Sequence, residues 1–172
     1  LRVYTKKQLG FMCESWVNNL KYVNLTDEEF KKYKLQKFDL LFNRTNSFEL
    51  VGKTSIFEED IDMSFASYLV RLRVDEEKLL PYYLNYYLNT KNTQNVLKEM
   101  ATKAVNQSNI NAEKLKSITI PLPPLKTQQK VVSYLDEISN KMEKIKQIQK
   151  EKMQSLKALK ASILDQAFRG EL

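Results

Sequence analysis

Two short segments gather side chains whose chemistry suits the edges of DNA bases. Asn43-Arg-Thr-Asn-Ser47 carries amide, guanidinium and hydroxyl groups, and Asn106-Gln-Ser-Asn109 carries three amides and a hydroxyl. Such groups donate and accept hydrogen bonds in the major groove. Both segments are polar and are predicted to be loops, and polar loops commonly only face water. These residue types alone leave base reading and simple solvent exposure both open.

Other chemistries are excluded by what the chain lacks. Its 172 residues include no histidine, one cysteine (Cys13) and three glycines (Gly10, Gly52 and Gly170). Without histidine there is no Ser-His-Asp or Cys-His nucleophile, and a single cysteine can form no disulfide within the chain. Three scattered glycines cannot build a phosphate-binding loop. We therefore expect no catalytic residue, no metal and no nucleotide cofactor on this chain.

Size, charge and hydrophobic content indicate a globular protein with a basic surplus and no membrane span. With 42% hydrophobic residues the chain can form one domain and an appendage. The net charge is +7, and it is shared: residues 1–124 carry 18 basic and 15 acidic side chains, and residues 125–172 carry 10 and 6. A basic balance suits nucleic acid but is also common in proteins that never bind DNA. No apolar run approaches the roughly 18 residues of a membrane span, so we expect a cytoplasmic protein. Because the chain begins with Leu1 rather than Met, we also expect residues upstream.

Residues 1–124 are predicted to form one domain of the α+β class, ending at Pro121-Leu-Pro-Pro124. Thr26-Asp-Glu-Glu29 reads as a capping box that opens a short helix. Asp39–Phe42 reads as a buried strand, and residues 50–57 as an extended segment around Gly52. In residues 67–74 the side chains alternate, with Arg71 and Arg73 opposite the apolar set, which predicts a half-buried strand with a basic outer face.

Helical patterns follow in the second half of this domain. Pro81 suits a first turn, and apolar residues at helical spacing continue to Met100 with a break near residues 89–92. The spacing of four tyrosines in this stretch (Tyr82, Tyr83, Tyr86 and Tyr87) favours core packing over base stacking. Asn111 is a plausible cap for one further helical turn, and residues 117–122 are predicted to be extended.

Residues 125–172 are predicted to form one long helix. Nothing interrupts the helical pattern from Lys126 to Phe168, about 65 Å at 1.5 Å per residue, and Gly170 suits its C-terminal cap. With Val131 at heptad position d, eight of eleven seam positions are apolar. These eight are Val131, Leu135, Ile138, Met142, Ile145, Leu156, Leu159 and Ile163. We therefore expect a second long helix to pair with it, from another copy or from another part of a longer chain; a purely structural spacer is the alternative.

Several segments, in order, resemble the specificity subunits of type I restriction-modification systems. They are residues 35–46 (LQKFDLLFNRTN), 65–74 (FASYLVRLRV), 104–120 (AVNQSNINAEKLKSITI), 120–128 (IPLPPLKTQ) and the ending 156–172. The resemblance covers almost the whole chain, as one target recognition domain followed by one conserved helical region. Two departures stand out: Phe38 occupies a position where the family usually has glycine, and the family's domain normally begins well before the segment matching Leu1.

The resemblance implies a division of labour among subunits. The recognition domain would bind double-stranded DNA and read one half of a bipartite target, and the helix would set the spacing and dock the modification and restriction subunits. S-adenosylmethionine and ATP would bind those partner subunits, so this chain would have no cofactor and no catalytic activity of its own. A half-subunit that self-associates as a dimer would read an interrupted palindrome.

The same resemblance selects the residues expected near DNA. The base-reading candidates are Arg44, Thr45, Asn46, Ser47, Asn106, Gln107 and Ser108. The phosphate candidates, assigned more loosely, are Lys53, Arg71, Arg73 and Lys103. Arg44 is the best single candidate, because arginine can pair bidentately with guanine.

Two other classes of function remain to be weighed. Charge and heptads alone also permit a coiled-coil DNA-binding or regulatory module without a methyltransferase partner. An enzyme is disfavoured, because Leu122-Pro-Pro-Leu125 lacks the residues that flank the paired prolines of adenine methyltransferases. Glu76-Glu-Lys78 likewise lacks the upstream Pro-Asp of a metal-dependent nuclease.

Overall fold

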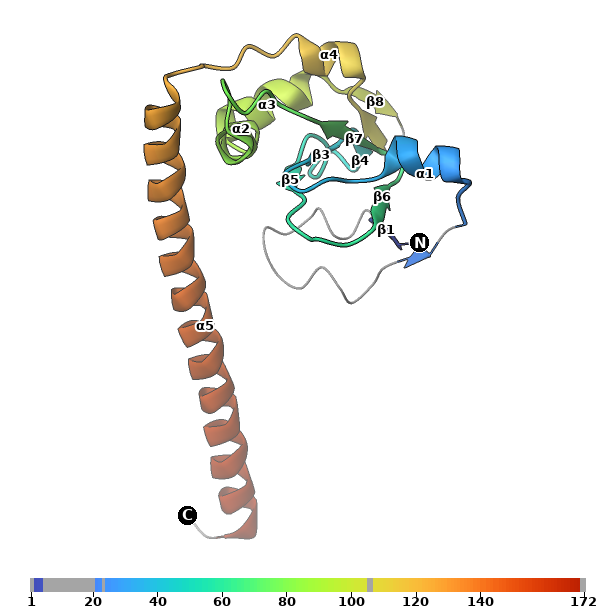
Figure 1. Ribbon diagram of the computed structural model, residues 1–172. Helices are drawn as coiled ribbons and strands as arrows, with labels where there is room; N and C mark the ends of the chain where they lie inside the picture. The colour runs from blue at the N-terminus through green and yellow to red at the C-terminus, as the bar shows by residue number, and fades with distance from the viewer. Residues whose placement is uncertain (1, 5–20, 23, 105–106, 171–172) are drawn as a thin grey trace. The chain divides into compact units, whose positions relative to one another are not determined.

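The computed structural model describes residues 2–4, 21–22, 24–104 and 107–170. The chain divides into two compact units, Leu1–Gln129 and Lys130–Leu172. The first unit mixes short strands and helices, and the second consists of the greater part of one long helix (Figure 1). This is the α+β architecture with a long C-terminal helix expected from the sequence, which is thereby confirmed. None of the helices among the described residues is long and apolar enough to cross a membrane.

The strands of the first unit form three small sheets. The first sheet has the order β2-β1-β6, from Lys21–Tyr22, Arg2–Tyr4 and Met63–Phe65. The second has the order β5-β3-β7, from Thr54–Ile56, Leu40–Asn43 and Leu69–Leu72. The third has the order β4-β9-β8, from Thr45–Asn46, Gln107–Asn109 and Thr102–Ala104. Except for the parallel pair β1 and β6, neighbouring strands are antiparallel.

Strand β3 lies at the centre of the core and is buried on both faces. Its residues Leu40, Leu41 and Phe42 are each at most 1% exposed, and each belongs to a different hydrophobic cluster. Antiparallel pairing on both sides satisfies its backbone. The buried strand predicted at Asp39–Phe42 is thereby found, shifted by one residue.

The turn that leads into β3 adopts a backbone conformation that suits glycine. The amide of Asp39 donates to the carbonyl of Gln36 at 3.0 Å, and Phe38 between them has a φ of 71°. A non-glycine residue reaches this left-handed region only at some energetic cost. The ring of Phe38 packs edge-on against Tyr82 at 6.0 Å. Phe38 thus replaces the family's usual glycine, while the backbone keeps the left-handed conformation that glycine favours.

The short helices begin where the sequence signals predicted. Helix α1 (Asp27–Tyr33) has the full capping box: the Thr26 hydroxyl accepts from the Glu29 amide, and the Glu29 carboxylate accepts from the Thr26 amide at 3.0 Å. Hydrogen bonds from the Thr26 amide, and then from its hydroxyl, lower the pKa of Glu29. Helix α4 (Ala112–Lys116) is capped by Asn111, whose side chain accepts from the Lys114 amide at 2.8 Å.

Helices α2 (Pro81–Leu88) and α3 (Lys91–Met100) are separated at Asn89 and Thr90, within the predicted break. The side chain of Asn89 satisfies backbone groups at an edge of the second sheet. Its Oδ1 accepts from the Thr54 amide at 3.3 Å, and its Nδ2 donates to the Thr54 carbonyl at 2.8 Å. The tyrosines of α2 are partly or fully buried, as core packing required. The hydroxyls of Tyr83 and Tyr87 hold the segment 119–121 by donating to the carbonyls of Pro121 and Thr119.

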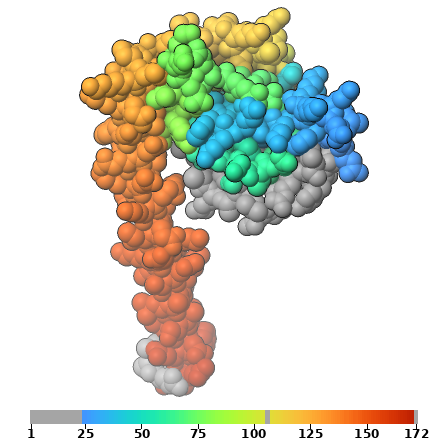
Figure 2. Space-filling view, in the orientation of Figure 1, coloured from blue at the N-terminus to red at the C-terminus, as the bar shows by residue number. Residues whose placement is uncertain are grey.

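Helix α5 runs without interruption over Leu125–Arg169, 45 residues or about 68 Å (Figure 2). Its predicted extent, 126–168, is confirmed within one residue at each end. Its first turn belongs to the first unit, where Gln128 is completely buried. Gly170 follows the helix with a φ of 72°, the conformation of a left-handed C-cap.

Candidate nucleic-acid interface

The two polar segments singled out in the sequence meet in one small sheet. Strand β4 pairs with β9, with Thr45 opposite Asn109 and Asn46 opposite Ser108, although these residues lie more than 60 positions apart. β9 also pairs with β8, which places Lys103 opposite Ser108. The prediction that both segments are loops was wrong: their backbone groups find partners in each other, which composition could not reveal. The sheet β4-β9-β8 is therefore the candidate interface.

Residues opposite one another in a sheet share a face, so this sheet has two distinct rows of side chains. Asn46, Ser108 and Lys103 form one row, and the other includes Thr45 and Asn109. The Asn109 side chain donates to the Thr45 hydroxyl at 2.9 Å, which fixes both.

The predicted base-reading residues differ in how much of them a ligand could reach. Ser108 is only 3% exposed, whereas Gln107 beside it is exposed. Thr45, Asn46 and Ser47 are partly exposed. Asn106 lies outside the described residues. Base reading by these side chains stays a prediction, and the exposed amide of Gln107 is better placed for it than the buried hydroxyl of Ser108.

The backbone of Arg44 is hydrogen-bonded on both sides, but the Nε of its side chain has no partner among the described residues. Its amide donates to the Tyr68 carbonyl at 3.1 Å, and its carbonyl accepts from the Ile110 amide at 2.9 Å. Its buried Nε has no hydrogen-bond partner among the described residues, and neither has the buried Nδ2 of Asn46. Buried donors without partners are costly and uncommon, so each calls for an explanation such as a water or a ligand. Both atoms are buried as the domain stands, so a base could accept from them only after their side chains move.

The turn that follows β4 is held by backbone hydrogen bonds. The Ser47 carbonyl accepts from the amides of Leu50 and Val51, and the Gly52 amide donates to the Asn43 carbonyl at 2.8 Å. Gly52 has a φ of 85°, and a Cβ there would approach side-chain atoms of Leu97 to 3.3 Å. Val51 is completely buried. Lys53, a predicted phosphate contact, is partly exposed where the turn joins β5.

Two of the predicted phosphate contacts have partners inside the domain. The Arg73 guanidinium forms a bidentate pair with Asp39, with Nε–Oδ1 at 2.6 Å and Nη2–Oδ2 at 3.0 Å. The Arg71 Nη1 donates to the Lys34 carbonyl at 2.7 Å. The hydrogen bond to Asp39 raises the pKa of Arg73, whereas burial and then the charge of Arg73 lower the pKa of Arg71.

The basic outer face predicted for residues 67–74 is found only in part: the Arg73 side chain is 45% exposed, as predicted, but the Arg71 end of the face is covered. Leu69 lies on the same face of β7 as Arg71 and is 3% exposed, so this end of the face belongs to the core. The Arg71 side chain is only 21% exposed. Apolar cover on both faces of the strand could not be read from alternation alone.

We expect the substitution Arg73→Ala to destabilise the fold by about 2 kcal/mol, because it leaves the buried carboxylate of Asp39 without its bidentate partner. Urea denaturation measures the change. Lys78→Ala is the control, since the Lys78–Asp75 pair is exposed and its loss is expected to change little. Equal midpoints for the two variants would contradict a structural role for Arg73.

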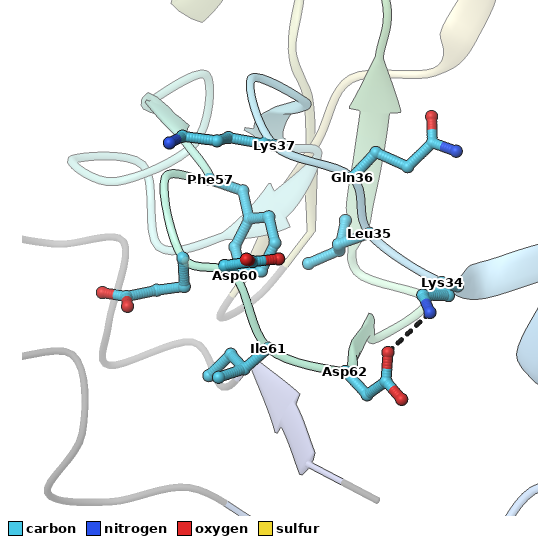
Figure 3. Close-up of a pocket in the computed structure, with 9 residues that line it drawn as sticks. Lys34, Leu35, Gln36, Lys37, Phe57, Asp60, Ile61 and Asp62 are labelled. Atoms are coloured by element: carbon cyan, nitrogen blue, oxygen red, sulfur yellow. Dashed lines mark ion pairs between the residues drawn. The ribbon is translucent and has the colours of Figure 1, made fainter.

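A hollow of about 580 Å³ elsewhere in the first unit is a poorer candidate for nucleic acid (Figure 3). Its lining residues are Lys34, Leu35, Gln36, Lys37, Phe57, Glu59, Asp60, Ile61 and Asp62. Lys34 pairs with Asp62 at 2.5 Å, which leaves Lys37 against Glu59 and Asp60. A surplus of carboxylates repels phosphate. Within the described ranges, no three acidic, cysteine or histidine side chains are grouped so that they could hold a metal ion.

Comparison with known proteins places these features in context. The family model described as "Type I restriction modification DNA specificity domain" matches residues 6–152. A Methanocaldococcus jannaschii protein, named as the specificity subunit of type I restriction enzyme MjaX, is 38% identical over 126 residues, which cover 72% of this chain and 30% of that protein. The EcoKI specificity subunit of Escherichia coli is 27% identical, over 90% of this chain and 34% of its own.

Solved structures give the same result. A chain from a study of the assembly and conformational transition of a type I R-M system aligns with a TM-score of 0.65 at 31% identity, over 81% of this chain and 33% of its own. The HsdS subunit of Thermoanaerobacter tengcongensis aligns with a TM-score of 0.54, also at 31% identity, over 81% of this chain and 31% of its own. The chain thus spans about a third of the length of the relatives it matches.

Proposed function

Because the chain belongs to the family of type I restriction-modification DNA specificity domains, we propose that it reads one half of a bipartite DNA target. The observation that carries this proposal is the sheet β4-β9-β8, in which two polar segments meet and present the exposed Gln107 beside the partly exposed Thr45 and Asn46. Base edges in the major groove offer the donors and acceptors that such hydroxyl and amide groups recognise. Lys53 and Lys103 would contribute affinity through phosphate without sequence information.

The proposal extends to the partners of the domain. Relatives are named as subunits of type I restriction enzymes, which supports docking to a modification subunit and a restriction subunit. We assign no catalytic step to this chain: methyl transfer with S-adenosylmethionine and ATP-driven cleavage would belong to those partners, in the cytoplasm. Membership of the family favours this role over a regulatory module without a methyltransferase. Co-purification with a modification subunit is the discriminating observation.

Selection from a pool of random DNA duplexes tests the reading role. We expect wild-type protein to recover a preferred sequence, and Arg44→Ala to lose preference at one base position by about 5- to 150-fold, the worth of one bidentate contact. Lys53→Ala is the matched control, because loss of a phosphate contact weakens binding to all sequences alike and lowers its salt dependence. Unchanged specificity of Arg44→Ala would contradict the role given to Arg44.

We also propose that α5 pairs with a second long helix. Apolar side chains are exposed along it, among them Met142, Ile145, Leu156, Leu159 and Ile163, at 45–56%. The exposed set includes residues outside the predicted seam: Ile148 at 62% and Met153 at 56% flank the polar positions Gln149 and Lys152. The apolar stripe therefore widens where the seam itself is polar. A helix that leaves such a stripe in water gains free energy by pairing.

A further inference from the structure

Phe48 is an apolar ring held at the surface beside the candidate base-reading residues. Its side chain is 41% exposed. It directly follows Ser47, whose amide donates to the Asn46 side chain at 2.8 Å and whose carbonyl accepts from Leu50 and Val51. Because Val51 is fully buried and both sides of the turn are hydrogen-bonded, the backbone that carries the ring is anchored to the domain.

Two ammonium groups from other elements lie against this ring. Lys103 of β8 places its Nζ 4.7 Å from the ring centroid, and Lys98 of α3 places its Nζ at 5.6 Å. Lys103 belongs to the row of the sheet that includes Asn46 and Ser108. The neighbouring carboxylate is Glu49, whose pKa is lowered by hydrogen bonds from its own backbone amide and from Ser47, and more weakly by Lys98. Three segments distant in sequence thus converge on one exposed ring with an excess of positive charge.

We infer that Phe48 contacts the 5-methyl group of a thymine in the target, with Lys98 and Lys103 on the phosphates beside it. This inference rests on the proposed function. The thymine methyl is the one apolar group that a base pair presents in the major groove, and phenylalanine is among the side chains that contact it. Stacking on a whole base would need an open ring face, but more than half of Phe48 is covered and an ammonium lies over the ring. The exposed part of the ring is open to an apolar contact with a methyl group.

The test uses the full chain and the duplex that wild-type protein recovers from the random pool. Each thymine of that duplex is replaced in turn by deoxyuridine, which removes only the methyl group, and binding is measured by fluorescence anisotropy. For wild type we expect a three- to tenfold loss of affinity at one thymine, the worth of one buried methyl. Phe48→Ala is expected to bind the thymine and deoxyuridine duplexes equally at that position.

Two further variants serve as controls. Phe48→Leu keeps an apolar side chain at the turn and is expected to retain part of the discrimination. Ile61→Ala removes an apolar side chain of similar exposure, 37%, from the separate hollow of Figure 3 and is expected to behave as wild type.

The outcomes separate this inference from the function on which it rests. If wild type recovers no preferred sequence, both are overturned. If it recovers one, the proposed function stands. The inference then fails if that sequence lacks thymine, or if no deoxyuridine substitution distinguishes wild type from Phe48→Ala.

Discussion

Replacing Gln128 by glutamate is expected to destabilise the protein by about 3–5 kcal/mol, although the two side chains have nearly the same shape. Gln128 is completely buried. Its Oε1 accepts from the Leu80 amide at 2.9 Å, and its Nε2 donates to the carbonyls of Lys78 and Pro123, both at 2.8 Å. Glutamate would lose both donated bonds and place a negative charge against two carbonyl oxygens, and a buried charge without a partner is among the costliest of defects.

The effect has a pH signature that a simple packing defect lacks. Burial and the facing carbonyls raise the pKa of a carboxyl introduced at this position above its unfolded value. The folded state then binds the proton more tightly, so the variant regains stability as the pH falls through that raised pKa. We expect the difference in free energy of unfolding between wild type and Gln128→Glu to shrink between pH 7 and pH 5.

The adjacent residue supplies the matched control. Gln129 is exposed, so Gln129→Glu adds the same charge one position along and is expected to change stability by no more than about 0.5 kcal/mol. Urea denaturation measures both variants, and hydrogen exchange of the Leu80 amide reports directly on the bond that Gln128 accepts. Equal denaturation midpoints for Gln128→Glu and Gln129→Glu would exclude the anchoring role.

Gln128 also shows which contacts the sequence cannot predict. It is the last residue of the segment 120–128 that resembles the family, and nothing near it in the sequence indicates that it joins residues 78–80 to the start of α5. Features that depend on neighbouring residues were predicted correctly from the sequence. They are the capping box at Thr26, the Asn111 cap and the uninterrupted helical pattern of α5. Each depends on hydrogen bonds or spacings between close neighbours in the chain.

The parts that were missed depend on contacts between distant residues. The pairing of β4 with β9 involves strands of only two and three residues, too short for an alternating pattern to show. The bonds between Arg73 and Asp39 span 34 positions, so the sequence could not show that this exposed arginine is paired with a buried carboxylate. A single aromatic residue in a turn predicts no function, so the sequence did not single out Phe48. It becomes a candidate because the fold places Lys98 and Lys103 against its ring.

The sequence therefore predicts which residues belong to the candidate interface, and the fold decides which of them a ligand can reach. Arg44 through Ser47 were identified by their chemistry, but only the fold shows that Gln107 is accessible and Ser108 is buried. The two buried donors on Arg44 and Asn46, which have no partner among the described residues, likewise become visible only in the fold.

Placing two carboxylates in the apolar seam of α5 is expected to abolish its pairing. Leu156 and Leu159 occupy seam positions a and d and are 53% and 56% exposed. Burying each leucine is worth at least about 1.5 kcal/mol, so Leu156→Glu with Leu159→Glu is expected to weaken association at least a hundredfold. Light scattering should give wild type a mass that rises above 20.3 kDa with concentration, and the double variant a constant 20.3 kDa.

The control must add the same charge without touching the seam. Gln154 and Ala161 both fall at position f, on the opposite side of the helix, so Gln154→Glu with Ala161→Glu is expected to associate as wild type does. Circular dichroism must show α5 intact in both double variants, because loss of helix would also end pairing. A wild-type chain that stays monomeric at all concentrations with its helix intact would contradict pairing between copies, whereas equal association of the two double variants would place the contact on another surface. Since an apolar stripe of this length is costly to leave in water, the seam variant alone should lose association.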